Sequence, residues 1–239
     1  MNKLPLKTIG ILGGMGPAAT ADLMEKIIDM TKAGCDQEHI PMIVDSNTRI
    51  PDRTKAILGE AESPVAEMLA SAKRLEEAGA DFIIIPCNTA HHFLPEIEDK
   101  IGIPFVHMPV ETANLLKQKG IRTAAVLATR GTYLSGQYDK VLADKDIRTL
   151  NPTPEQQEML MSLIYDYIKS GVTDPSALPR DEIAEIVSDL ESRGAEALLL
   201  ACTELPLAFS ILNLYDESCV DPTAVLAAAA IREAGGEIR

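Results

Sequence analysis

The chain has 239 residues, of which 46% are hydrophobic and 24% charged, a composition typical of a globular protein with one large or two small domains. Acidic side chains outnumber basic ones by 36 to 22, so the formal charge of −14 excludes a basic surface for nucleic acid or an anionic membrane. The longest apolar run, 224–231, is much shorter than the roughly 18 residues that span a bilayer. We therefore expect neither a nucleic-acid partner nor a membrane partner.

The N-terminal region and the cysteines indicate the compartment. Two lysines precede an apolar stretch, as in a secretory signal, but glycines and a proline at 13–17 interrupt that stretch. A buried strand that runs into a turn explains it better, so we expect a leaderless, cytoplasmic chain. The 4 cysteines form no Cys-x-x-Cys pair, which argues against a zinc ribbon or a thioredoxin-type motif. In a reducing compartment they should be thiols.

In chain order, short apolar runs alternate with longer amphipathic stretches. The runs are continuous, as expected for parallel strands that are covered on both faces. They predict strands at 8–12, 42–44, 82–85, 104–106, 124–127 and 198–200. The amphipathic stretches predict helices at 18–32, 64–77, 155–169 and 181–193. The fold class is therefore α/β with open parallel sheets.

Several of these helices carry sequence signals for their own ends. Thr153 and Gln156 form a capping box, and Ser63 stands before Pro64 at the start of another helix. Glycines at 34, 79, 120, 171 and 194 are expected to end helices.

An internal repeat divides the sequence into two halves. Segment 7–17 aligns without gaps on 122–132, an offset of 115, and 75–87 aligns on 190–202 with the same offset. A common offset indicates duplication of an α/β half, whereas the general likeness of α/β units would not produce it. The expected domains are 1–112 plus about 214–239, and 113–213.

The repeat places Cys87 and Cys202 at equivalent positions, each just after an apolar strand. Ligands of open parallel sheets bind beyond the carboxyl ends of the strands. If the halves face each other about a pseudo-two-fold axis, both thiols point into a cleft between them. Two opposed thiols could invert a carbon stereocentre, because one removes a proton from one face while the other returns a proton to the opposite face.

The neighbours of the two cysteines differ. Asn88 and Thr89 are cap-forming residues that would start a helix beside Cys87 and favour its thiolate. The negative charge of Glu204 should favour the neutral thiol of Cys202. A disulfide between the two cysteines is a competing interpretation that a cytoplasmic setting disfavours.

Two loops and two arginines offer groups for an anionic ligand. The loop at 14–19 fits the dinucleotide pattern G-x-G-x-x-A, but it and its counterpart at 129–132 are better interpreted as backbone nests for a smaller anion such as a carboxylate. Arg49 and Arg53 follow the strand at 42–44, where either could clamp a carboxylate, although a solvated surface arginine is the usual finding.

Three further side chains are candidates for supporting roles. Tyr165 and Lys169 are four residues apart and should share a helix face. His91 could orient the segment that carries Cys87. No third ligand at metal spacing accompanies the histidines, so we predict no metal.

Taken together, five motifs resemble those of the aspartate/glutamate racemase family, above all its PLP-independent aspartate racemases. The motifs are Gly13-Gly-Met-Gly-Pro17, Pro51-Asp-Arg-Thr54, Pro86-Cys-Asn-Thr-Ala-His91, Leu127-Ala-Thr-Arg-Gly-Thr132 and Cys202-Thr-Glu204. The resemblance covers essentially the whole chain. It implies two similar α/β domains with the active site in the cleft between them, two catalytic cysteines, no cofactor and a homodimer.

By motif, the resemblance assigns acid and base roles to Cys87 and Cys202, and it assigns the substrate carboxylates to Arg53 and Lys169. The residues that it places around the substrate are Met15, Asn88, Thr89, Thr129 and Thr203, with possible support from Gly16, Arg49, Thr132, Tyr165, Glu204 and His91. Arg49 and Arg130 depart from the family pattern, and their extra positive charge could alter which dicarboxylate fits.

The resulting hypothesis is cofactor-independent interconversion of L- and D-aspartate by the two cysteines. The alternatives are a related cofactor-free reaction, namely glutamate or hydantoin racemisation, maleate isomerisation or arylmalonate decarboxylation. A non-catalytic amino-acid sensor is a further alternative.

Overall fold

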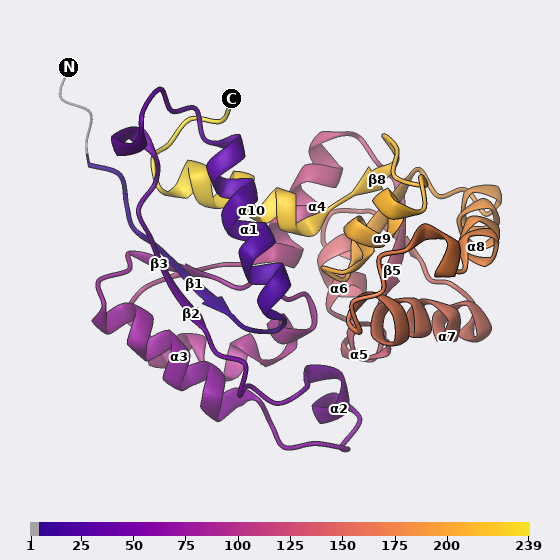
Figure 1. The fold of residues 1–239 in the computed structure, drawn as a ribbon, viewed down its shortest axis with the longest axis horizontal. Coiled ribbons are helices and arrows are strands. Elements are labelled where there is room, and N and C mark those ends of the chain that lie inside the picture. Colours follow the sequence, from indigo (N-terminus) through magenta and orange to yellow (C-terminus); the bar gives the residue numbers. More distant parts are fainter. Residues whose placement is uncertain (1–4) are drawn as a thin grey trace. The chain divides into compact units, whose positions relative to one another are not determined.

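Two four-stranded parallel sheets organise residues 5–239, which are the residues that this computed structural model describes (Figure 1). The first sheet has the order β2-β1-β3-β4 and the second the order β6-β5-β7-β8, so equivalent strands occupy equivalent places. The strands are β1 Ile9–Gly13, β2 Met42–Ser46, β3 Phe82–Ile84, β4 Phe105–Val106, β5 Thr123–Ala128, β6 Arg148–Leu150, β7 Ala197–Ala201 and β8 Cys219–Val220. This repeated order is what a duplicated α/β half predicts.

Helices connect the strands in both sheets. The α-helices are α1 Pro17–Met30, α2 Arg53–Ile57, α3 Val65–Glu77, α4 Met108–Gln118, α5 Arg130–Ser135, α6 Gln137–Ala143, α7 Pro154–Ser162, α8 Arg180–Ser192, α9 Leu205–Ile211 and α10 Pro222–Glu233. The 3-10 helices are Asp36–Glu38, Thr89–Glu96, Glu98–Lys100 and Pro175–Ala177, and Leu163–Ile168 forms a π-helical turn. The chain folds as two units, residues 1–111 with 223–239 and residues 112–222. The predicted α/β class with two parallel sheets is confirmed.

In the first unit, successive side chains of each strand are buried on opposite faces of the sheet, as the pleat requires. Figure 1 shows α1 and α10 on one side of this sheet and α3 on the other. One buried cluster joins β1 and β3 to α1 and α10 through Ile9, Ile11, Phe82, Ile84, Leu23, Ile27, Leu226 and Ile231. The other joins the same strands to α3 through Leu12, Ile83, Met68, Ala72 and Leu75. Coverage of both faces explains why these strands read as continuous apolar runs.

In the second unit, β5 and β7 form the centre of the core. Their residues pack with α7, α8 and α9 in a cluster that includes Ala125, Leu127, Leu198, Leu200, Leu160, Ile186 and Phe209. Cys202, which follows β7 directly, belongs to the same cluster. Cys202 is therefore buried in the same core as the strand that precedes it.

Some predicted helix boundaries are wrong. The helix predicted at 18–32 ends at Met30, because Thr31 turns to an extended conformation and pairs with Ile238. Ser63 is not the cap of α3; Pro64 takes that place, and the Ser63 hydroxyl accepts a bond from the Val65 amide at 3.3 Å. The capping box of Thr153 and Gln156 is confirmed at the start of α7.

The helix predicted at 155–169 is not α-helical throughout. It is α-helical as α7 and then widens into the π-helical turn Leu163–Ile168. The turn closes with the Lys169 amide bonded to the Ile164 carbonyl at 2.9 Å. Such turns are rare and often occur at functional sites.

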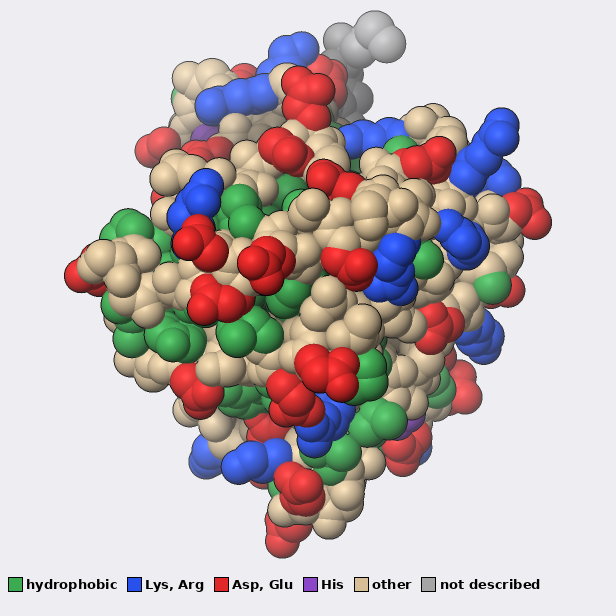
Figure 2. Space-filling model, turned by 90° about the vertical axis from the view of Figure 1, so that its right-hand side faces the viewer, with side chains coloured by type: hydrophobic (Ala, Val, Ile, Leu, Met, Phe, Trp, Pro, Cys, Tyr) green, Lys and Arg blue, Asp and Glu red, His purple; other side chains and the backbone are tan. Residues whose placement is uncertain are grey.

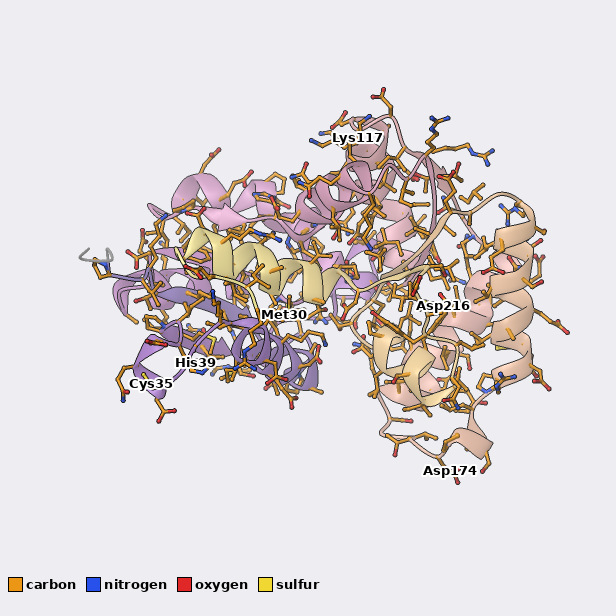
Figure 3. All side chains as sticks on the ribbon, turned by 90° about the horizontal axis from the view of Figure 1, so that it is seen from above. Met30, Cys35, His39, Lys117, Asp174 and Asp216 are labelled. Carbon is orange, nitrogen blue, oxygen red and sulfur yellow. The ribbon has the colours of Figure 1, made fainter. Side chains whose placement is uncertain are left out.

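The surface agrees with the composition. Figure 2 shows acidic side chains interspersed with basic and hydrophobic ones on the face in view. No helix among residues 5–239 combines the length and the hydropathy that a bilayer span requires. All four cysteines are free thiols, and Cys35, labelled in Figure 3, lies exposed on the connection from α1 to β2.

Candidate active site

In the first unit, Cys87 is buried three residues beyond the end of β3. Its amide bonds the Ile85 carbonyl at 2.9 Å, which bends the chain sharply after the strand. The 3-10 helix Thr89–Glu96 begins two residues later, with Asn88 at its N-cap. Asn88 makes no capping bond with its side chain, because its backbone is helical (φ −59°) rather than extended as in a cap. Asn88 and Thr89 are both buried beside the cysteine.

His91 anchors this segment. Its Nδ1 lies 2.9 Å from the Cys87 carbonyl oxygen, and its Nε2 lies 3.2 Å from the Met108 amide. A carbonyl can only accept and an amide can only donate, so Nδ1 carries the proton and Nε2 accepts. Burial lowers the pKa of His91 to about 4, which keeps the ring neutral. A neutral His91 thus ties the residue that bears the thiol to the start of α4.

The β1–α1 loop is held in a tight conformation. Gly14 has φ +91°, and a Cβ there would lie 2.4 Å from the backbone of Asn47. The Thr20 hydroxyl accepts from the Gly14 amide at 2.9 Å and donates to the Gly16 carbonyl at 3.1 Å. Only glycine fits this turn, and Met15 is buried within it.

Arg53 and Arg49 behave differently in the structure. One guanidinium nitrogen of Arg53 donates to the Met15 carbonyl at 3.2 Å, and the other donates to the Pro51 carbonyl at 3.1 Å. Arg53 therefore brings its charge to the β1–α1 loop. Arg49 is exposed, and its amide bonds the Asn47 side chain at 3.1 Å. The structure joins Met15 to Arg53 but does not bring Arg49 to them.

In the second unit, the β5–α5 loop is the counterpart of the β1–α1 loop. Thr129 caps α5 through a bond from the Thr132 amide, and the two hydroxyls lie 3.2 Å apart. Both threonines are buried, whereas Arg130 points outward and pairs with Glu158. Arg130 is thus engaged in a surface ion pair.

Tyr133 is a partly buried group that the sequence analysis missed. Its hydroxyl accepts from the Ala128 amide at 2.8 Å and donates to the Val126 carbonyl at 3.1 Å. Burial raises the pKa of Tyr133 above its usual value. These two bonds connect α5 to the end of β5 and so hold the loop that carries Thr129. No motif signals this role, because the bonds go to backbone atoms.

A polar network surrounds Cys202. The Cys202 thiol donates to Glu204 Oε2 at 2.9 Å, and the Thr203 hydroxyl donates to the same oxygen at 3.1 Å. Lys169 Nζ lies 3.0 Å from Glu204 Oε1 and 5.3 Å from the centre of the Tyr165 ring. Five predicted site residues therefore lie together: the π-helical turn supplies Tyr165, and Lys169 follows the turn directly.

This network determines which of its groups is protonated in the unliganded protein. Burial raises the pKa of the Cys202 thiol well above its usual value, and the charge of Glu204 raises it further, against the opposing effect of Lys169. Burial alone would raise the pKa of Glu204, but the Lys169 ammonium and the donated hydrogen bonds bring it below its ordinary value. The carboxylate is thus charged and the thiol is neutral, as the position of Glu204 in the sequence predicts.

Among residues 5–239, no three His, Cys, Asp or Glu side chains gather in the way that a metal ion requires. The site residues described above carry thiols, a carboxylate, cations and hydroxyls. Thiols are competent acids and bases, and cations stabilise negative charge that develops on a bound carboxylate.

Residues 12–230 match the family described as Asp/Glu/Hydantoin racemase. Because this match spans most of the sequence, the chain belongs to the Asp/Glu/hydantoin racemase family. The resemblance that the motifs indicate is therefore confirmed.

Three relatives show what the chain is similar to within this family. The structure of Picrophilus torridus aspartate racemase is 35% identical, with a TM-score of 0.84 over 98% of this chain and 96% of that one. An aspartate racemase homologue from Pyrococcus horikoshii OT3 is 25% identical, with a TM-score of 0.77 over 96% and 100% of the two chains. The broad specificity amino-acid racemase RacX of Bacillus subtilis is 28% identical over 202 residues, 82% of this chain and 85% of that protein.

Proposed function

We propose that this chain interconverts L- and D-aspartate without a cofactor, with Cys87 and Cys202 as the acid and base. The observation that carries the proposal is the equivalent position of the two cysteines, each beyond the corresponding strand of one of two identically ordered sheets. The similarity to an aspartate racemase over 98% of the chain supports the substrate.

Racemisation requires one proton-transfer group on each face of the α-carbon. In our proposal the Cys87 thiolate removes the α-proton, and the neutral Cys202 thiol donates a proton to the opposite face; the reverse reaction exchanges the roles. The resting thiol of Cys202 suits it to act first as the acid. The electron pair left on the α-carbon delocalises into the α-carboxylate, which the protein must stabilise electrostatically.

Cations select a dicarboxylate in this proposal. Arg53 holds a guanidinium at the β1–α1 loop, and Lys169 holds an ammonium beside Cys202. A substrate carboxylate at Lys169 would share the ammonium with Glu204, so the ion pair must loosen or bridge on binding. Similarity to RacX supports a second candidate, a racemase that accepts several amino acids.

The test uses purified protein with reductant and without added PLP, in D2O with L-aspartate. We expect the optical rotation and the α-proton NMR signal to decay together. Cys87→Ala and Cys202→Ala should each lower the racemisation rate by about 100-fold or more. Cys35→Ser is the matched control, because Cys35 is exposed and outside both loops, and it should react at the rate of the unaltered protein.

Each other outcome points to a definite alternative. If aspartate does not react, the proposed substrate is wrong. Reaction with glutamate, several amino acids, hydantoins, maleate or an arylmalonate would then identify the substrate. Full turnover in both alanine variants would refute the cysteine assignment. Binding of aspartate by calorimetry without any reaction would favour an amino-acid sensor.

We also propose that the protein is a cytoplasmic homodimer. Four free thiols, three of them buried, suit a reducing compartment. Light scattering at micromolar concentration tests the assembly, and a mass of a single chain would refute it.

A further inference from the structure

The two cysteines differ in one chemical respect. Cys202 donates its thiol proton to Glu204 Oε2 over 2.9 Å, and the same carboxylate bonds Lys169 over 3.0 Å. The repeat offset aligns Glu204 with Thr89, an uncharged residue beside Cys87. At this position of the repeat, the second unit therefore has a carboxylate where the first has a hydroxyl.

A two-base racemase faces a problem after each turnover. The sulfur that acted as the base now holds a proton, and the sulfur that acted as the acid has lost one. Before another molecule of the same enantiomer can react, both sulfurs must exchange protons with solvent. Cys202 is only 7% exposed, so water has little direct access to its thiol.

Glu204 connects this buried thiol to a more accessible region. The exposed fraction of the side chain is 13% for Glu204 and 26% for Lys169, so accessibility increases from the thiol through the carboxylate to the ammonium. The Thr203 hydroxyl holds the carboxylate oxygen that faces the thiol. The carboxylate thus has one oxygen on Cys202 and the other on Lys169.

We propose that Glu204 is a proton relay, which takes a proton from solvent and passes it to the Cys202 thiolate after each turnover in which Cys202 has acted as the acid. This inference rests on the racemase function proposed above. In the relay an O–H bond of hydronium or water breaks, which leaves water or hydroxide, and an O–H bond forms on Glu204. That bond then breaks as the S–H bond of Cys202 forms, without any change of oxidation state.

The charges around Cys202 favour this direction of transfer. The titratable groups that face it are Glu204 on its own loop, Lys169 after the π-helical turn and Tyr133 on α5. A thiolate beside a carboxylate places two negative charges in contact, so a proton that arrives at the pair is strongly bound. It settles on sulfur, because the raised pKa of the thiol exceeds the lowered pKa of the carboxyl group.

Steady-state kinetics with aspartate distinguish a relay from a structural role. In Glu204→Gln the exchange of protons between turnovers becomes slow, and we expect kcat to fall by about tenfold or more. Product inhibition by the opposite enantiomer should change from competitive to noncompetitive, because product then binds an accumulated enzyme form that substrate does not bind. Added imidazole should restore part of kcat in Glu204→Gln and leave the unaltered protein unchanged.

Two variants serve as controls. Glu204→Asp keeps a carboxylate and should retain competitive product inhibition. Glu182→Gln removes an exposed carboxylate on α8 and should behave as the unaltered protein. A purely structural role of Glu204 would raise KM and leave the inhibition competitive and imidazole without effect; that result would overturn the relay.

Alkylation of Cys202 gives a readout that does not depend on turnover. Mass spectrometry follows the Cys202 peptide during iodoacetamide treatment over a range of pH. Glu204→Gln should move the half-alkylation pH down by about one unit or more, because a negative charge and an acceptor are lost. An unchanged profile would overturn the relay even in an active racemase. If the unaltered protein racemises no substrate, the proposed function fails, and the relay fails with it.

Discussion

At the residue scale, the protein gives its two candidate cysteines different supports. Cys87 is held through its backbone, since its carbonyl accepts from the neutral ring of His91. Cys202 is held through its thiol, which donates to Glu204. The first arrangement sets position without adding charge, whereas the second sets both position and proton affinity.

His91 predicts a pH dependence of stability. Its pKa is about 4 in the folded chain and 6.5 in the unfolded chain, so the unfolded state binds the extra proton between these values. The contribution of neutral His91 is therefore complete above pH 6.5 and decreases as the pH falls toward 4. The full shift corresponds to about 3 kcal/mol.

Urea unfolding at several pH values measures this effect. We expect the difference in unfolding free energy between the unaltered protein and His91→Gln to decrease as the pH falls through that window. His92→Gln is the control, because His92 is exposed, and its difference should stay constant. A constant difference for His91→Gln as well would show that His91 is not buried in its neutral form.

Sequence reasoning at this scale proposed both cysteines and Glu204 from the strand ends, whereas it proposed Lys169 from its helical spacing to Tyr165 and from the family resemblance. It could not foresee Tyr133, whose hydroxyl bonds two backbone groups, nor that Arg53 bonds main-chain carbonyls. Such bonds depend on where the backbone passes, and no side-chain pattern records that.

At the element scale, α7 and the π-helical turn form a single support for Lys169. The capping box starts α7 at Thr153, and the wider turn ends it beside Lys169. The start of this support was predictable, because capping has a local signature. The widening was not, because the apolar residues of 163–168 fit an α-helix equally well.

The cap itself predicts a measurable loss. Thr153→Ala leaves the Gln156 amide without its hydroxyl acceptor and should lower the unfolding free energy by about 1 kcal/mol. Thr153→Ser keeps the hydroxyl and should cost much less. Urea midpoints compare the three proteins, and equal losses in the two variants would show that the threonine methyl group, not the cap, stabilises α7.

The main elements that the sequence analysis did not predict are two short strands. β6 has three residues and begins with Arg148, and β8 has only the two residues Cys219 and Val220, so neither forms a recognisable apolar run. Both are edge strands of the second sheet, where pairing with β5 and β7 defines them. Their existence follows from long-range pairing rather than from local sequence.

At the scale of the whole molecule, the repeat predicted two sheets of one design, and the identical strand order agrees with it. The position at which the chain returns to the first unit is marked less clearly in the sequence. In the structure, β8 at Cys219–Val220 pairs with β7, and the first unit resumes at Thr223.

The last helix completes the first core. Ile231 of α10 is fully buried in the cluster with β1 and β3, so Ile231→Ala should lower the unfolding free energy by about 2–5 kcal/mol. Arg232→Ala, at the exposed neighbour, should change it by less than about 0.5 kcal/mol. Hydrogen exchange should show the loss of protection in β1 and α1, and a loss confined to α10 would contradict this role.

The return of α10 also orders events during synthesis. The Lys7 amide bonds the Ala234 carbonyl at 3.0 Å, and the Lys7 ammonium meets Glu233 at 2.5 Å, so the first unit closes with residues that the ribosome adds late. Residues 112–222 are contiguous and are made earlier than α10. The second unit can therefore fold while the first unit still lacks α10, which covers one side of its core. The unit whose translation begins first is thus the last to complete its fold.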